Sequence, residues 1–197
     1  MAGNSGVLKN ELVPVSNFSD LERGAPFLSG PLYAGLPQVL PLLHAASALG
    51  MAEAVVSNLI DLASTGRQQV QSPVPMRDSD IFKFELGRVV ADLRAARALL
   101  QAQVASHWHH AVAGTRFGEA QLAESSQAAA WTTTTCVRVA DVCFALAGGS
   151  AVYESSPLQR RLRDVHVAGQ HARLQQRHYV SAGQQLLARP GEVPAAA

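Results

Sequence analysis

The chain has 197 residues, of which 48% are hydrophobic and 16% are charged, a balance typical of a globular protein with an extensive core. Its net charge of +1 offers no general attraction for nucleic acid or for an anionic membrane, so neither is expected as a partner. Polar residues interrupt the most apolar stretch, residues 36–60, which is therefore not expected to cross a membrane.

The first part of the chain predicts one strand and a loop. Residues Val7–Val15 contain β-branched and apolar residues in a nearly alternating pattern. One strand cannot bury its edges, and no second strand-like run follows it. We therefore expect residues 1–35 to be a remnant of a β-domain, the last strand of a sheet whose other strands are absent, followed by a Gly- and Pro-rich linker.

Long helical patterns follow. They predict helices at Leu36–Ala63, from a cap at Asp78 or Ser79 to about Val112, at Glu119–Ala147, from Pro157 through His166, and at about Gln175–Leu187. Short connections join them, which favours an all-α, antiparallel four-helix bundle over residues 36–188. The Pro- and Ala-rich residues 189–197 are expected to be a disordered tail.

The second predicted helix has an apolar stripe with steps of three and four residues. Its members are Phe82, Leu86, Val89, Val90, Leu93, Ala96, Leu100, Val104 and Trp108. In the third predicted helix, Cys136 and Cys143 share one face but lie about 10 Å apart along the axis, too far for a disulfide. Two packed, reduced thiols and no visible signal peptide are typical of a cytoplasmic protein.

Three histidines, His107, His109 and His110, are close together in the sequence HWHH. His107 and His110 share a helix face, whereas His109 points elsewhere. No carboxylate or cysteine lies nearby in sequence to complete a coordination shell. The cluster therefore predicts an interfacial or surface group, and no metal site is expected.

The segment Ala147–Ser150 (AGGS) separates two helices. Two glycines allow a ligand to approach the backbone closely, and exposed N–H groups can hold an anionic group. A helix C-cap is the commoner explanation of a Gly-Gly pair.

Basic residues and histidines are concentrated in Ser155–His171. Its arginines and Asp164 can form ion pairs within and between helices, as on an ordinary solvated helix face. His166 and His171 are five positions apart and would not share a helix face, so they are not a ligand pair. Each could act as a single acid or base near neutral pH.

Together these segments resemble the C-terminal domain of the acyl-CoA dehydrogenase superfamily. GRQQV is similar to the family's Arg-x-Gln-Phe turn, and IFKFELGRVVADLRAARALL is similar to its second bundle helix. FALAGGSAVY lies where the family has its Gly-Gly flavin loop, and PLQRRLRDVH resembles its Pro-x-x-Arg-x-x-Arg-Asp signature. ELVPVSNFSDL resembles the final strand of the family's β-domain. The resemblance covers nearly all of residues 7–188.

The resemblance implies a tetrameric flavoprotein whose flavin lies between domains and is partly held by a neighbouring subunit. Arg67, Gly148, Gly149 and Ser150 match flavin-contacting positions, near the phosphate end of the cofactor. Val70 stands where the family usually has Phe.

A dehydrogenase of this family needs a carboxylate to remove a proton from its thioester substrate. The family's usual Glu follows the Arg-Asp pair by eight positions, where this chain has Ala172. The alternative position on the first bundle helix is also empty, because residues 23–52 contain neither Asp nor Glu.

Gln170-His171 occupies that region instead, as in the family's flavin-dependent monooxygenase branch. There a histidine works beside a reduced flavin, FMN or FAD, delivered by a separate reductase. It takes a proton from a phenolic substrate or hydrogen-bonds to the oxygenated flavin. The resemblance assigns this catalytic role to His171 first, near the flavin ring, and to His166 second.

The leading interpretation is therefore the C-terminal domain of a monooxygenase that hydroxylates a small aromatic or related molecule. An acyl-CoA dehydrogenase-like oxidoreductase whose base comes from elsewhere is a second hypothesis. A non-catalytic fragment that only oligomerises is a third, because the expected flavin pocket needs walls that lie outside this sequence.

Overall fold

The computed structural model describes residues 30–33, 36–69 and 72–188, and this part of the chain is helical and contains no strand. Its main helices are α2 (Leu36–Ser64), α3 (Asp80–Ala113), α4 (Glu119–Ala147), α5 (Pro157–Gly169) and α6 (His178–Leu187). Short 3-10 helices lie between them: η1 (Pro31–Tyr33), η2 (Met76–Asp78), η3 (Gly148–Ala151) and η4 (Ala172–Leu174). The predicted strand Val7–Val15, Val70 and the predicted tail 189–197 lie outside the described residues.

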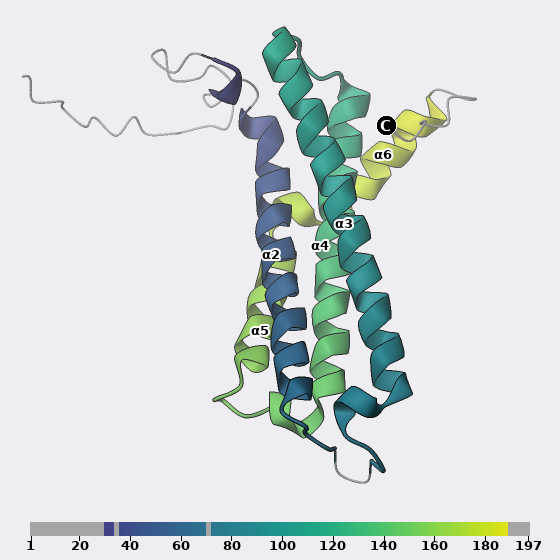
Figure 1. Ribbon diagram of the computed structural model, residues 1–197. Helices are drawn as coiled ribbons and strands as arrows, with labels where there is room; N and C mark the ends of the chain where they lie inside the picture. The colour runs from purple at the N-terminus through teal and green to yellow at the C-terminus, as the bar shows by residue number, and fades with distance from the viewer. Residues whose placement is uncertain (1–29, 34–35, 70–71, 189–197) are drawn as a thin grey trace, which may run out of the picture.

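The predicted antiparallel bundle is confirmed. Figure 1 shows α2, α3 and α4 side by side and antiparallel in chain order, with the shorter α5 along the lower half of α2. The fourth helix therefore covers only part of the bundle's length. Helix α6 packs on α4 and extends away from the bundle at its upper right.

Local sequence explains where the helices begin and end. The Ser79 hydroxyl accepts a hydrogen bond from the Phe82 backbone N–H (3.4 Å) and caps α3. Gly114 ends α3 in a left-handed conformation with φ of 66°. Pro157 begins α5, where its missing N–H leaves no helical hydrogen bond unmade.

Helix α2 is the most apolar element and packs against α3, α4 and α5. Ala45, Ala48 and Ala52 are completely buried, and such small side chains let neighbouring helices approach closely. By length and composition alone, residues Gln38–Ser64 could cross a membrane. Nearly half of the most apolar window is buried inside the bundle, as expected for a core helix.

Towards its C-terminal end, the buried face of α3 differs from the predicted stripe. Phe82, Val89, Leu93, Ala96 and Leu100 are buried as predicted, whereas Val104 and Trp108 are each 47% exposed. Gln103 and His107 are buried in their place. Steps of three and seven residues from Leu100 lead to positions 103 and 107, so helix geometry continues the buried face through two polar residues.

Two of the HWHH histidines, His107 and His110, contact the segment that leads from α3 into the start of α4. The His107 ring hydrogen-bonds through Nε2 to the Ser125 hydroxyl (2.9 Å) and meets Phe117 edge-on, with ring centroids 4.0 Å apart. His110 Nδ1 and the Thr115 hydroxyl are 2.8 Å apart. The interpretation of the cluster as an interfacial group agrees with these contacts.

Burial of His107 should make the protein less stable in mild acid. Desolvation, helped by the nearby His110, lowers the pKa of His107 from 6.5 to about 4. The folded protein then binds fewer protons than the unfolded chain between these values, so stability is fullest above pH 6.5 and falls as the pH drops towards 4. The loss is at most about 3 kcal/mol, at about 1.4 kcal/mol per pKa unit.

Urea unfolding at pH 7 and pH 4.5 measures this loss. The difference in unfolding free energy should shrink in His107→Gln, whose amide can still bond to Ser125, and should persist in the exposed control His109→Gln. A loss of equal size in both variants would contradict the assignment to His107.

The two cysteines are packed as predicted. Cys136 and Cys143 are both free and fully buried in the core. Burial raises the pKa of each thiol to about 12, so both are protonated and unreactive near neutral pH.

Candidate functional site

The predicted flavin-contacting residues gather at one end of the bundle. The turn after α2 begins at Arg67, whose backbone carbonyl accepts a hydrogen bond from the Met76 N–H (2.9 Å). Two residues later, the Gln69 side chain donates to the Leu146 carbonyl at the end of α4 (2.6 Å). This bond joins the Arg67 turn to the Gly148–Ala151 segment, although the two are far apart in sequence.

The helix C-cap reading of the Gly-Gly pair is confirmed at Gly148. Gly148 caps α4, and its positive φ of 59° is a conformation that residues with a Cβ rarely adopt. At Gly149, a Cβ would meet no other atom within 4 Å, so this side of the backbone is open. The hydroxyl oxygen of Ser150 is buried and has no hydrogen-bond partner in the described structure. Open backbone beside an unpaired hydroxyl fits the polar phosphate end of a nucleotide cofactor.

Adding a methyl group at Gly148 should destabilise this loop, whereas the same change at Gly149 should be tolerated. A Cβ at Gly148 would lie 3.4 Å from Gln69 Nε2 and would have to adopt the positive φ. We expect Gly148→Ala to cost about 1–3 kcal/mol of unfolding free energy, the usual cost of such backbone strain. Urea unfolding with Gly149→Ala as the matched control measures it, and equal effects at both glycines would contradict the account.

His171 lies just after α5, away from the end of the bundle that holds the Gly-Gly loop. It is the N-cap of η4, and its Nδ1 accepts a hydrogen bond from the Arg173 backbone N–H (3.3 Å). Its ring packs on His44 of α2, with ring centroids 3.9 Å apart and planes inclined by 34°. Because Nδ1 is the acceptor, neutral His171 carries its proton on Nε2.

The environment of His44 disfavours a positive charge. Partial burial lowers the pKa of His44 most, followed by the charges of His171 and Arg173.

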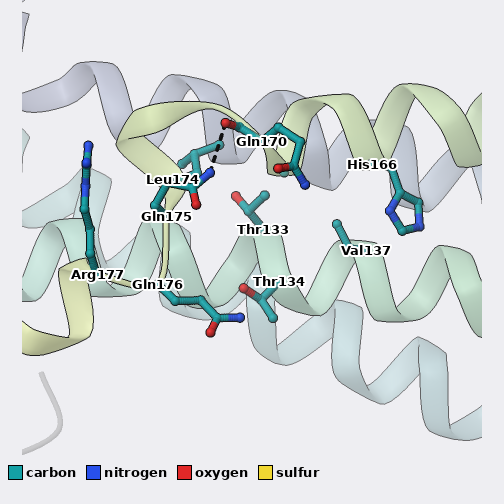
Figure 2. Close-up of a pocket in the computed structure, with 10 residues that line it drawn as sticks. Thr133, Thr134, Val137, His166, Gln170, Leu174, Gln175, Gln176 and Arg177 are labelled. Atoms are coloured by element: carbon teal, nitrogen blue, oxygen red, sulfur yellow. Dashed lines mark hydrogen bonds between the residues drawn. The ribbon is translucent and has the colours of Figure 1, made fainter.

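His166 lies on a different side of α5. Its Nε2 is 2.7 Å from Asp141 Oδ1 on α4, and both side chains are exposed. Figure 2 shows its ring beside a pocket of about 410 Å³ between α4 and the segment that follows α5. The pocket walls combine apolar groups with the polar residues Thr133, Thr134, Gln170, Gln175, Gln176 and Arg177.

The structure thus separates the two predicted catalytic histidines, which contact different helices. His166 faces Asp141 on α4, whereas His171 faces His44 on α2. The sequence placed both histidines on one helix, on different faces. In the structure only His166 belongs to that helix, because α5 ends at Gly169 and His171 lies beyond it.

The structure also separates His171 from the Gly-Gly loop. His44, which marks the level of His171, is 20 residues before the end of α2 at Ser64. At 1.5 Å per residue this is about 30 Å along the bundle. Within one chain, His171 is therefore remote from Arg67 and Gly148, and the roles predicted for these residues at a flavin stay predictions.

The basic cluster has structural partners, as its ordinary reading expects. Arg160 pairs with Asp164 one turn away (3.7 Å), and Arg161 Nε donates to the Asn58 side-chain oxygen on α2 (2.6 Å). The Arg161 contact joins α5 to α2. The Arg160 pair engages Asp164, the one acidic residue between Ser155 and Gly191.

Sequence reasoning missed His44. It entered only as a polar interruption of an apolar stretch, and its partner is 127 positions away in the chain. The sequence did contain one signal. His44 lies in the stretch 23–52, which includes the family's alternative position for a base and contains neither Asp nor Glu.

Comparisons with known proteins find the same helical domain over most of the chain. Residues 42–176 match the family described as acyl-CoA dehydrogenase, C-terminal domain. The solved structure of XiaF from Streptomyces sp., in complex with FADH2 and glycerol, superimposes with a TM-score of 0.78 at 22% sequence identity. The superposition covers 85% of this chain and 43% of XiaF.

Two curated relatives are hydroxylating enzymes by name. The chain is 32% identical over 133 residues to a pigment production hydroxylase of Rhodococcus erythropolis, covering 68% of this chain and 33% of that protein. It is 30% identical over 161 residues to an indole-3-acetate monooxygenase of Pseudomonas putida, covering 80% and 39%. The chain therefore spans little more than a third of the length of these relatives.

Proposed function

Because the chain belongs to the acyl-CoA dehydrogenase C-terminal domain family, we propose that it is the helical domain of a reduced-flavin-dependent monooxygenase that hydroxylates a small aromatic or related molecule with O2. The curated relatives named as a hydroxylase and a monooxygenase support this branch of the family. The proposal concerns the whole enzyme, of which this chain supplies one domain.

The main support for the proposal is the His171 imidazole, which lies in the region where the family's dehydrogenases have a catalytic carboxylate. The family's dehydrogenase base would fall at Ala172, and the neighbouring His171 packs on His44. Both groups are imidazoles, and neither has the negative charge that a carboxylate keeps near neutral pH. Hydroxylation needs a hydrogen-bonding or proton-exchanging group here, which an imidazole provides.

His171 is suited to act on an oxygen atom. With Nδ1 held by the Arg173 N–H, its Nε2 is free to donate a hydrogen bond or to exchange a proton with a substrate hydroxyl. His166 is the second candidate, since it lies beside the polar pocket and its pairing with Asp141 orients the ring.

The residues at the Gly-Gly end fit the phosphate end of a flavin. Arg67 would supply positive charge, and the Gly148 and Gly149 backbone together with the Ser150 hydroxyl would supply hydrogen bonds. When bound, FMN or FAD in its reduced form supplies the electrons for oxygen activation. Since this end lies about 30 Å from His171, we propose that the two groups serve two different flavin molecules, as expected if a neighbouring subunit shares each site.

This function requires further partners. We propose a separate flavin reductase as the source of reduced flavin, a homo-oligomer, with the tetramer of the family resemblance as its form, and a cytoplasmic location. We also propose that residues 1–35 belong to the β-domain that covers the flavin, with residues 36–188 as the bundle.

The function is tested on the longest protein that contains this chain. Supplied with reduced FMN or FAD, oxygen and a panel of aromatic compounds, it should yield a hydroxylated product. Reduction of a dye by acyl-CoA substrates in place of hydroxylation would favour the dehydrogenase alternative. Neither activity, together with no binding of flavin, would favour a non-catalytic oligomerisation domain.

A further inference from the structure

The contact between His44 and His171 couples two titratable rings that are remote in sequence. Their ring centroids are 3.9 Å apart. A positive charge on one imidazole disfavours a positive charge on another within about 4–6 Å. The contact is therefore an electrostatic coupling as well as a packing contact.

In the described part of the chain, the charged groups that act on His44 are His171 and Arg173, and both oppose its protonation. Residues 36–52 of α2 contain no Asp or Glu, and the first acidic residue on this helix, Glu53, is about 13 Å away along the axis. Four carboxylates on α2 and the neighbouring helices have cationic partners of their own: Glu53 with Arg97, Asp92 with Arg138, Asp141 with His166, and Asp164 with Arg160.

The backbone fixes the orientation of the pair. The Arg173 N–H holds His171 Nδ1, while the His44 ring limits rotation of the His171 ring from one face. His44 itself is carried on a long, well-packed helix, between the buried Leu42 and Ala45. A side chain on such a helix is a rigid support for a ring on a short connecting segment.

We propose that His44 is a positioning residue for His171: its ring fixes the His171 ring with Nε2 outward. This inference rests on the proposed function for its catalytic meaning, because it is His171 that would meet the substrate.

Titration of the histidine rings by NMR in the 197-residue chain tests the proposal. In His171→Phe, which keeps an aromatic ring but removes the charge, the pKa of His44 should rise above its value in the unaltered protein. The exposed control His109→Phe should leave the pKa of His44 unchanged.

An unchanged pKa of His44 in the His171→Phe variant would overturn the proposal. Circular dichroism checks that this variant is folded, and His171→Gln serves in its place if it is not. Because titration requires neither flavin nor substrate, its result is independent of the proposed function. Coupled rings in a protein without hydroxylase activity would contradict that function alone, and uncoupled rings in an active hydroxylase would contradict this inference alone.

Discussion

Replacement of His171 by alanine should lower the rate of hydroxylation by the enzyme that contains this chain by about a hundredfold or more, the usual worth of a positioned proton-exchanging group. The ring is exposed, and its free Nε2 is the atom proposed to face the substrate oxygen. Alanine removes that nitrogen. The His44 ring on α2, which packs against the His171 ring, does not replace it. The rate is measured at saturating reduced flavin, oxygen and aromatic substrate.

Two further variants test whether the loss of hydroxylation is specific to His171. His109→Ala removes an exposed imidazole from α3 and should leave the rate unchanged. His166→Ala should have a smaller effect than His171→Ala, because His166 is the second candidate. If His171→Ala hydroxylates at the unaltered rate, the catalytic assignment of His171 is wrong.

Replacement of Leu59 by alanine should destabilise the bundle by about 2–5 kcal/mol, the range for removing a large buried aliphatic side chain. Leu59 is 0% exposed and belongs to the single core cluster that α2 shares with α3, α4 and α5. Such tightly packed helices cannot close fully over the lost volume, so part of the cost is a cavity. Urea unfolding at neutral pH measures the change in unfolding free energy.

The matched control is Leu43→Ala on the same helix. Leu43 is 51% exposed, so its loss should cost about 1 kcal/mol or less. Equal destabilisation by both leucine variants would mean that α2 does not present the face described here to the core.

Most of the fold could be predicted from helix signals along the chain. Gly118 and the Gly148–Gly149 pair bound α4 where they were expected to, and Pro157 begins α5. The last helix begins at His178 and not at Gln175, because η4 and a turn intervene after His171. On α3, hydrophobicity alone selected Val104 and Trp108, whereas helical geometry buries Gln103 and His107, whose polar atoms find partners on α4.

The candidate site could be predicted only in part. The motifs identified the Arg67 turn and the Gly-Gly loop, and the bond from Gln69 to Leu146 joins them. The pairing of His171 with His44 could not be predicted, because it depends on how the end of α5 crosses α2. Periodicity within one helix carries no information about such crossings.

The central claim, oxygen insertion by a reduced-flavin enzyme, is tested most directly with isotopic oxygen. The enzyme that contains this chain is supplied with reduced flavin, an aromatic substrate that it consumes and ¹⁸O₂, and the product is analysed by mass spectrometry. We predict that each hydroxylated product molecule contains one ¹⁸O atom. A product without ¹⁸O, formed equally well when oxygen is replaced by an artificial electron acceptor, would contradict the monooxygenase account.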